Sequence, residues 1–448
     1  MIARTKKGER GHNTTLLGRV LANCGLAAGI GALLWTAAAH AGLAEREQAQ
    51  IIHNRLTGTQ ASDAMLDMME AEIVADSVNG PKVAARLAID GNDDSAKSYG
   101  ADITPTGGFY NAVVKNWASP WTNEAQDIFQ SLNDYSATVI GMVRDELDFR
   151  GLLYSNIIYV GGVPGISAYS ATDNNHYEEL EAQSQPLGDD TVLVRDVQSG
   201  VTGIPQAGVA GVLTTRAAAR AYFIDGTNRA MFRFTLLNHL CNDLEQYKDN
   251  ELPTDRIRQD VSRSPGGDST IFLNVCSGCH TGMDGMAGAF AYHQYEYPSE
   301  EEQPGLTEEE RQEMGRLVYT RGVVQEKYLI NSGNFRDGFV TTNDHWINYW
   351  RKGPNAQKIG WLSAVKTSPI DEALDPDYSE GDGMRSLGQE LAHTDAFAYC
   401  QVKKAFKTIC LREPRDGDST DVESIVTSFK SGFNMKQVFI DVAAYCSK

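Results

Sequence analysis

The sequence predicts a mainly α-helical protein in which strands are few and short. From Gly42 to Ala88, apolar residues recur at the three-to-four-residue spacing of a helix that buries one side. The C-terminal stretch from Leu387 to Cys446 is also expected to be helical. β-Branched runs occur at Ile157–Val160 and Thr191–Val194. Gly, Pro and Asn surround both runs, which favours short strands within an irregular region.

Further helices are expected between these regions. One begins at Pro120 and extends to about Leu147, with Thr122 or Asn123 as its N-cap. The sequence is compatible both with a continuous helix and with a break in it near Asn133. The other expected helices cover residues 214–223, residues 229–246, and three segments of 387–446 that are separated at 412–414 and 431–433.

The first 41 residues have the three parts of a signal peptide. Five basic residues precede an apolar run from Val20 to Ala39, and Ala39-His40-Ala41 has the small-x-small pattern of a cleavage site. The sequence therefore predicts a signal peptide over residues 1–41 and a periplasmic location. The alternative is an uncleaved anchor, because the run is near the length that spans a bilayer. No second stretch of about 18 apolar residues occurs, so no stable membrane insertion is expected after cleavage.

The chain is acidic, with 40 Lys and Arg against 59 Asp and Glu. Without the leader, which holds five basic residues and one acidic residue, the net charge is −23. Such a charge argues against nucleic acid and anionic membrane surfaces as partners, and favours a partner with a basic surface. The most acidic segment, residues 298–312, is expected to be exposed.

The main candidate cofactor-binding residues lie in the motif Cys276-Ser277-Gly278-Cys279-His280. Two thiols three residues apart on a forming helix can each make a thioether with one vinyl group of the same porphyrin. The histidine after the second cysteine then lies under the iron as its proximal ligand. The sequence therefore predicts one covalently attached c-type haem, held by Cys276, Cys279 and His280.

Two other sites use similar residues. A zinc site needs a second close Cys/His pair, and Cys400 and Cys410 lack that spacing. A thioredoxin-like dithiol needs a strand before the motif and a helix after it. Residues 271–275 are apolar enough for a short strand, but the Gly-rich sequence after His280 does not suit that helix.

The run from Gly211 to Tyr297 resembles the secreted cytochromes first noted in planctomycetes. In that family a helical segment and a Pro-rich turn lead to CxxCH, and an Asp-Pro/Gly-x-x-x-x-Phe element follows. Here the element lies within Met283–Phe290, and Leu387–Cys446 is similar to the family's closing helical segment. Its turn at Leu411–Pro414 departs from the Gly-Arg-x-Pro of the relatives. The resemblance implies a helical c-type haem domain and no particular substrate.

These observations divide the chain into three parts. The signal peptide is followed by a helical and loop-rich region of unknown role at 42–210, and then by a helical, c-type cytochrome-like haem domain at 211–448. Arg263, with Arg256 and Arg258, is a candidate to hold a haem propionate, because guanidinium groups bind carboxylates bidentately. Surface charge is the alternative for these arginines.

Aromatic residues after the motif are candidates for the haem wall. Phe290 is the first of them, and ordinary core packing is the alternative. The others are Tyr292, Tyr295 and Tyr297.

The sixth iron ligand must approach from the opposite face of the porphyrin. The chain needs at least about six extended residues to pass the macrocycle edge. Met283 is therefore excluded, and Met286 would have to be fully extended. Met384 is the preferred metal ligand, because it is expected in a Gly-rich loop just before a helix, where the backbone can approach the haem closely. An ordinary loop methionine is the alternative. His345 and His393 are the alternative candidates for this ligand. His293 could reach the iron only if the chain turned tightly around the edge of the porphyrin.

The remaining cysteines are expected to form two disulfides. If residues 395–411 are one helix, Cys400 and Cys410 lie about 15 Å apart and cannot pair with each other. An up-down-up arrangement of the C-terminal helices favours Cys410 with Cys446, which leaves Cys400 with Cys241. Four free thiols are the alternative.

Two functions are compatible with such a haem. A protein with both axial positions filled shuttles single electrons between redox partners. A haem enzyme, peroxidase-like or oxygenase-like, keeps the sixth position open. The sequence favours the electron carrier, a periplasmic monohaem cytochrome.

Overall fold

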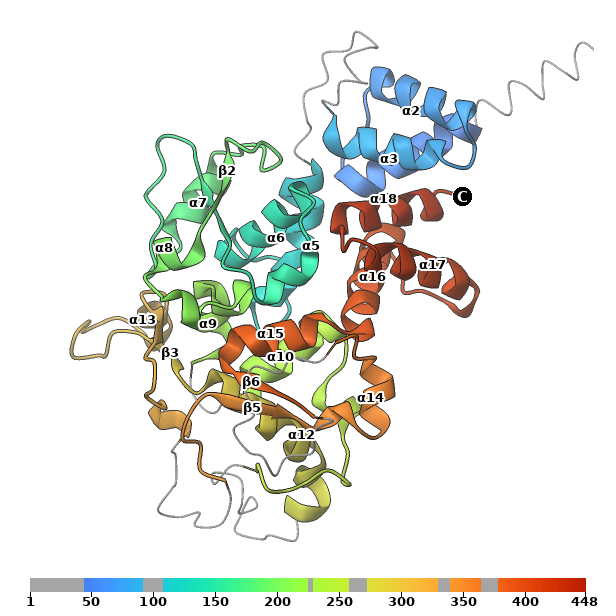
Figure 1. Ribbon diagram of the computed structural model, residues 1–448. Coiled ribbons are helices and arrows are strands. Elements are labelled where there is room, and N and C mark those ends of the chain that lie inside the picture. Colours follow the sequence, from blue (N-terminus) through green and yellow to red (C-terminus); the bar gives the residue numbers. More distant parts are fainter. Residues whose placement is uncertain (1–43, 92–107, 225–228, 258–271, 329–338, 364–377) are drawn as a thin grey trace, which may run out of the picture.

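The computed structural model describes residues 44–91, 108–224, 229–257, 272–328, 339–363 and 378–448 (Figure 1). The protein is mainly helical, as predicted. The predicted signal peptide lies outside the described residues. Among the helices that the structure describes, none has the length and apolar character needed to cross a membrane.

Three helices form the described N-terminal part, which confirms the helical prediction over residues 44–88. Ser62 caps the second helix by accepting a hydrogen bond from the Met65 amide at 3.2 Å. Within this part, α2 packs on α3, and α3 packs on the C-terminal helix α18 (Met435–Cys446) (Figure 1). Their bounds are 44–57, α2 (Asp63–Ala75) and α3 (Gly80–Asp90).

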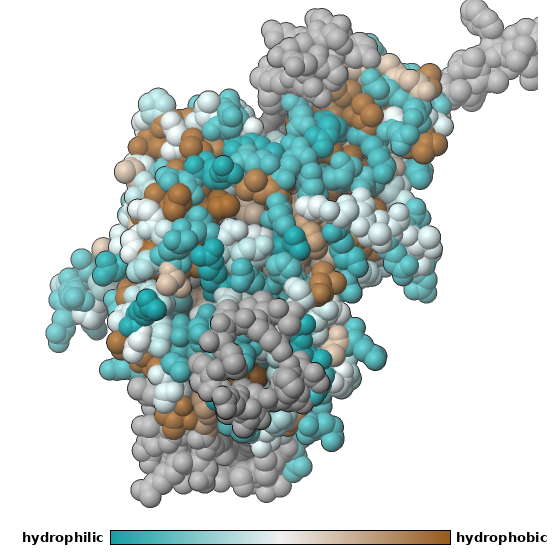
Figure 2. Space-filling view, viewed as in Figure 1, coloured by the Kyte–Doolittle hydropathy of each residue, from teal (hydrophilic) through white to brown (hydrophobic). Residues whose placement is uncertain are grey.

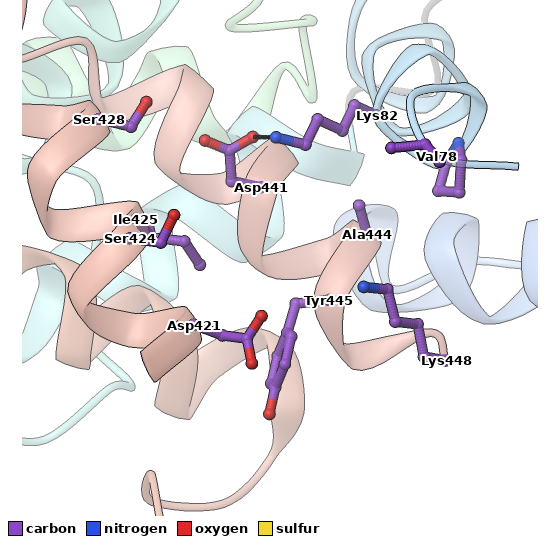
Figure 3. A pocket seen from close by; sticks show the side chains of 11 residues that line it. Val78, Lys82, Asp421, Ser424, Ile425, Ser428, Asp441, Ala444, Tyr445 and Lys448 are labelled. Carbon is purple, nitrogen blue, oxygen red and sulfur yellow. Dashed lines mark ion pairs between the residues drawn. The ribbon is translucent and has the colours of Figure 1, made fainter. Parts of the chain in front are cut away.

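A pocket of about 370 Å³ lies where this N-terminal part meets α17 and α18. Lys82 of α3 reaches across to Asp441 of α18, and their charged atoms are 2.9 Å apart (Figure 3). Asp90 of α3 forms an ion pair with Lys436 of α18, and Arg86 forms one with Glu146, which follows α6. Ion pairs from α3 therefore hold the N-terminal helices to α18 and to the residues after α6.

The expected helix at 120–147 begins later than predicted. Thr122 ends a short 3₁₀ turn, and the helix starts after Asn133, whose side chain accepts hydrogen bonds from the Tyr135 and Ser136 amides. Asn133 and Ser136 form a reciprocal capping box, which Asn123 does not. The elements here are η1 (Phe109–Val114), α5 (Lys115–Ala118), η2 (Ser119–Thr122), α6 (Asp134–Arg144) and η3 (Phe149–Leu153).

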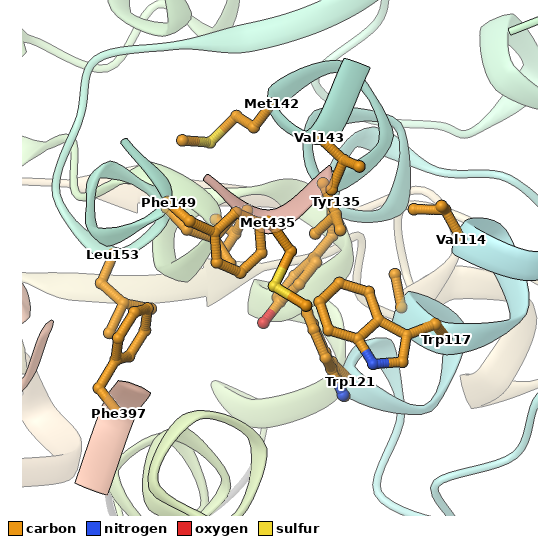
Figure 4. Packing of buried hydrophobic residues seen from close by; sticks show 14 of the residues in the cluster. Val114, Trp117, Trp121, Tyr135, Met142, Val143, Phe149, Leu153, Phe397 and Met435 are labelled. Atoms are coloured by element: carbon orange, nitrogen blue, oxygen red, sulfur yellow. The ribbon is translucent and has the colours of Figure 1, made fainter. Parts of the chain in front are cut away.

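Aromatic side chains from distant segments meet in the core. Trp117, Tyr135 and Phe149 converge there with Phe397 and Met435 from the C-terminal helices (Figure 4). The Trp117 and Phe149 rings lie 5.9 Å apart. One cluster of buried apolar side chains extends from Ala49 to Ala443, across the predicted boundary at residue 210.

The two short strands predicted in the middle region are confirmed. They pair antiparallel, with Tyr159 opposite Arg195. Buried His176 hydrogen-bonds the Gly161 amide at 2.8 Å and the Ser167 carbonyl at 2.7 Å, so it has a structural role. The elements are β1 (Ile158–Gly161), α7 (Asn175–Ala182), β2 (Leu193–Asp196), α8 (Gln198–Thr202), η4 (Gln206–Gly208) and η5 (Gly211–Thr214).

Helices α9 and α10 follow. Thr215 caps α9 by accepting from the Ala218 amide. Helix α10 ends at Leu240, earlier than expected, because Cys241 has a left-handed backbone and Asp243 caps a new 3₁₀ turn. The bounds are α9 (Arg216–Tyr222), α10 (Arg229–Leu240) and η6 (Leu244–Tyr247).

Residues 297–315 form an arm between strands β3 and β4, visible at the left of Figures 1 and 2. Its Glu residues are exposed, which confirms the prediction for 298–312. The elements from the motif to this arm are η9 (Phe272–Cys276), α12 (Ser277–Ala287), η10 (Gly288–Phe290), β3 (His293–Glu296), α13 (Glu308–Gln312), β4 (Arg316–Tyr319) and η11 (Glu326–Tyr328).

A third two-stranded sheet, β5 with β6, lies between helices α12 and α15. Trp346 and Asn348 of β5 hydrogen-bond Ser386 and Glu390 of α15. Helix α12 also packs on β5, where glycines at its C-terminal end lie against the backbone carbonyl oxygens of His345 and Ile347. The bounds are β5 (His345–Asn348), η12 (Tyr349–Arg351), α14 (Pro354–Ile359), β6 (Ser379–Asp382) and α15 (Gly383–Ala392).

The C-terminal stretch forms four helices where three were predicted, within residues 378–448. The additional break falls at Thr394, whose side chain caps α16 by accepting from the Phe397 amide at 3.0 Å. The breaks predicted at 412–414 and 431–433 are confirmed. The elements are α15, bounded as above, and then α16 (Asp395–Cys410), η13 (Asp416–Asp418), α17 (Ser419–Lys430) and α18 (Met435–Cys446).

Both predicted disulfides are confirmed. Cys241 pairs with Cys400 and Cys410 pairs with Cys446, with Cα–Cα distances of 5.2 and 5.5 Å. Helix α16 separates Cys400 from Cys410, as the pairing argument required.

Candidate functional site

The motif lies at the junction of η9 and α12. Cys276 is the last residue of η9, and Cys279 and His280 fall in the first turn of α12. Both cysteines are partly buried, and neither joins a disulfide, although the other four cysteines of the described chain do. A helical turn, rather than a strand, precedes Cys276. The strand that a thioredoxin-like site requires is therefore replaced by helix.

Helix α12 forms in spite of its glycines because two of them, together with Gly288 directly after the helix, allow a close approach to its neighbours. A Cβ at Gly282 would overlap the indole of Trp350. A Cβ at Gly285 would lie 2.8 Å from the Ile347 carbonyl oxygen, and one at Gly288 would lie 2.5 Å from that of His345. The expectation that glycines after His280 disfavour a helix was wrong, since packing on β5 outweighs their low helix propensity.

The segment from Leu244 to Asn250 holds the start of α12. The Asp249 amide donates to the Gly278 carbonyl at 2.9 Å, and the Thr281 hydroxyl donates to the Asp249 carbonyl at 3.1 Å. The Cys279 thiol donates to the Leu244 carbonyl at 3.6 Å. Burial raises the pKa of the Cys279 thiol, so this group is protonated at neutral pH.

His280 is oriented by a buried carboxylate one helical turn later. Its Nδ1 lies 3.1 Å from both oxygens of Asp284, and the Asp284 side chain is 0 % exposed. An ionised carboxylate only accepts, so the proton is assigned to Nδ1 and the lone pair to Nε2. Histidines that bind metals usually have such a partner on the other ring nitrogen. The two thiols and this imidazole fit the attachment of a c-type haem.

The candidate propionate ligands are described only in part. Arg263 and Arg258 lie outside the described residues. The guanidinium carbon of Arg256 lies 4.7 Å from the ring centre of Phe339, and the neighbouring Ile257 packs against Cys276. Arg256 is thus the predicted arginine that the described structure brings close to the motif.

Phe290 lies at the opposite end of α12 from His280, about 15 Å along the helix axis. It is fully buried and contacts Phe223 edge-on, with ring centres 6.1 Å apart. Tyr292 and Tyr295 are also buried. The structure does not bring these residues to the cysteines, and their visible contacts are those of the core.

Met384 lies in the first turn of α15 and is 1 % exposed. Helix α15 packs on the β5–β6 sheet and on η10, the turn that follows α12, and α12 itself packs on β5. The prediction that Met384 lies in a loop was wrong, because α15 begins at Gly383. Met384 as sixth ligand stays a prediction.

The alternative candidate histidines are engaged elsewhere. His345 Nδ1 lies 3.0 Å from Asp382, and its Nε2 lies 3.3 Å from Glu380. His393 donates through Nδ1 to the Gln389 carbonyl, and His293 donates through Nε2 to the Gly208 carbonyl at 2.8 Å. Within the described ranges, no group of three or more His, Cys, Asp or Glu side chains is placed to hold a metal ion.

Sequence reasoning did not assign a role to Asp284. It was noted only as part of the element after the motif. The available signal was its spacing, since residues four apart share one side of a helix.

Comparisons of the chain with family models, curated proteins and solved structures find no match. The resemblance to the planctomycete-type cytochromes therefore rests on the sequence features themselves: CxxCH, the element within Met283–Phe290 and the closing segment Leu387–Cys446.

Proposed function

We propose that the protein is an exported monohaem c-type cytochrome that transfers single electrons. The observation that carries the proposal is the arrangement around His280. Two thiols outside any disulfide stand one helical turn apart, next to an imidazole whose Nδ1 is held by buried Asp284. The four other described cysteines are oxidised in pairs, which supports a separate use for these two.

The residues of the motif have distinct roles in this proposal. Cys276 and Cys279 would each hold the haem by a thioether to one vinyl group: the sulfur would bond to one vinyl carbon and the thiol proton would go to the other, so no oxidant is needed. His280 would bind the iron through Nε2. The haem supplies a one-electron iron couple when bound. Arg256 or Arg263 would hold a propionate.

The charge of the chain supports the choice of partner. A net charge of −23 without the leader favours a redox protein with a basic surface, and disfavours nucleic acid. The exposed glutamates of the arm at 297–315 contribute to this charge on the surface. Export to the periplasm is part of the proposal, because thioether attachment follows export.

An absorption spectrum of the purified full chain tests the proposal. For an electron carrier we expect a low-spin reduced spectrum that carbon monoxide does not change. A spectrum that shifts with carbon monoxide would instead establish the alternative, a haem enzyme with an open sixth position. Absence of any haem absorption after expression with a working attachment system would refute both.

Met384→Ala extends this test to the sixth ligand. If Met384 binds the iron, the variant should become sensitive to carbon monoxide. An unchanged spectrum would remove Met384 as the ligand.

A further inference from the structure

The hydrogen bond between His280 and Asp284 has consequences for the iron. We infer that Asp284 is a positioning residue that fixes the ring of His280 and lowers the reduction potential of the bound haem. The inference rests on the proposed haem function, and it adds a residue that controls the redox property of that site.

The geometry supports this role. Nδ1 of His280 is equidistant from both Asp284 oxygens, at 3.1 Å, so the ring is aligned with the middle of the carboxylate. The Asp284 side chain is 0 % exposed, and the His280 side chain is 11 % exposed. Both residues belong to α12, which packs closely on β5 through its glycines, so the pair is held by a rigid element.

The electrostatic consequence follows from burial. A carboxylate shielded from water interacts more strongly with nearby charge than an exposed one does. Its negative charge, and the hydrogen bond that it accepts from Nδ1, make Nε2 a stronger donor to iron. Ferric iron carries one more positive charge than ferrous iron and gains more from both effects. The ferric state is therefore favoured, which means a lower potential.

A purely structural role is the competing explanation, because an Asp four residues after a His can simply stabilise a helix. The two explanations differ in their readouts. A structural role changes the unfolding temperature of the haem-free chain and leaves the potential of the attached haem unchanged. The role inferred here changes the potential.

The experiment compares full-length wild type with Asp284→Asn, which keeps the shape of the side chain and removes its charge. We expect Asp284→Asn to retain covalent haem and to raise the ferrous-to-ferric ratio at least tenfold at a fixed potential, which corresponds to about 59 mV. Asp284→Glu, which keeps the charge, should remain near wild type. Asp134→Asn is the matched control, because Asp134 is also a buried carboxylate but accepts from the Arg216 and Ala217 amides instead.

The outcomes separate the inference from the proposal beneath it. Wild type without covalent haem refutes the proposed function. If wild type and Asp284→Asn both hold haem and have the same potential, the inference alone is overturned. A structural role would then be assigned if Asp284→Asn changes the unfolding temperature of the haem-free Cys276→Ala/Cys279→Ala chain. If Asp284→Asn fails to hold haem while Asp284→Glu and Asp134→Asn hold it, the requirement for a carboxylate on Nδ1 is supported.

Discussion

The C-terminal helices and the region around α12 use their cysteines in opposite ways. Cys400 and Cys410 of α16 are both oxidised, one to Cys241 and the other to Cys446. Cys276 and Cys279 stand only three residues apart and form no disulfide. One region uses sulfur to join segments distant in the sequence. The other presents two thiols and a histidine within five consecutive residues, and joins no distant segment through its sulfur.

The largest expected effect breaks this comparison at the motif. Cys276→Ala/Cys279→Ala should abolish covalent haem, because both attachment atoms are removed. Denaturing gel electrophoresis with haem staining measures it. Cys410→Ala/Cys446→Ala is the matched control and should keep the stain. Equal staining of both double variants would contradict the division of the cysteines.

The second prediction concerns the stability that each disulfide provides. The Cys241–Cys400 bridge spans 159 residues and the Cys410–Cys446 bridge spans 36. Loop-closure entropy predicts losses of about 5 and about 4 kcal/mol when each is removed. Urea unfolding of the two double alanine variants should show this order. A larger loss from the shorter bridge would mean that contacts, rather than loop length, decide its contribution.

The third prediction concerns pH. Burial lowers the pKa of His293 to about 4. In the unfolded chain its pKa is about 6.5, so the unfolded state binds more protons between these values. His293 should therefore contribute a fall of on the order of 3 kcal/mol in the free energy of unfolding as the pH drops from 6.5 to 4. Urea unfolding at both pH values measures the total fall, to which buried His239 also contributes, because burial lowers its pKa too. His293→Gln should reduce the fall by the His293 contribution, and a variant with the wild-type slope would contradict this assignment.

The smallest expected effect tests why α12 contains glycine. Gly282→Ala places a methyl group against Trp350, and overpacking of this kind costs about 1–3 kcal/mol. Gly432→Ala is the control, because a Cβ there meets no atom within 4 Å. Thermal unfolding of both variants checks the difference. Comparable unfolding temperatures for the two would show that the neighbours of α12 can move.

Much of the helical fold could be predicted from residue spacing and capping. The disulfide partners followed from helix length, because a helix fixes the distance between Cys400 and Cys410. The start of α6 was misjudged, since Thr122 and Asn133 are both acceptable caps and only the reciprocal bonds of Asn133 decide between them.

The candidate site was only partly predictable. Cys276, Cys279 and His280 are adjacent in sequence, so their meeting required no tertiary information. Met384 and Phe290 depended on how distant segments pack. The β5–β6 sheet between α12 and α15, and the burial of Phe290 against Phe223, are set by tertiary contacts that sequence spacing does not contain.

The most direct test of the central claim is mass spectrometry of the denatured, unreduced full chain, followed by peptide mapping. Covalent attachment predicts an intact mass raised by one haem, with the added mass on the peptide that contains both Cys276 and Cys279. The disulfide-linked peptides should carry Cys241 with Cys400 and Cys410 with Cys446. A peptide in which Cys276 and Cys279 are free thiols or joined to each other, from protein matured with a working attachment system, would contradict the claim.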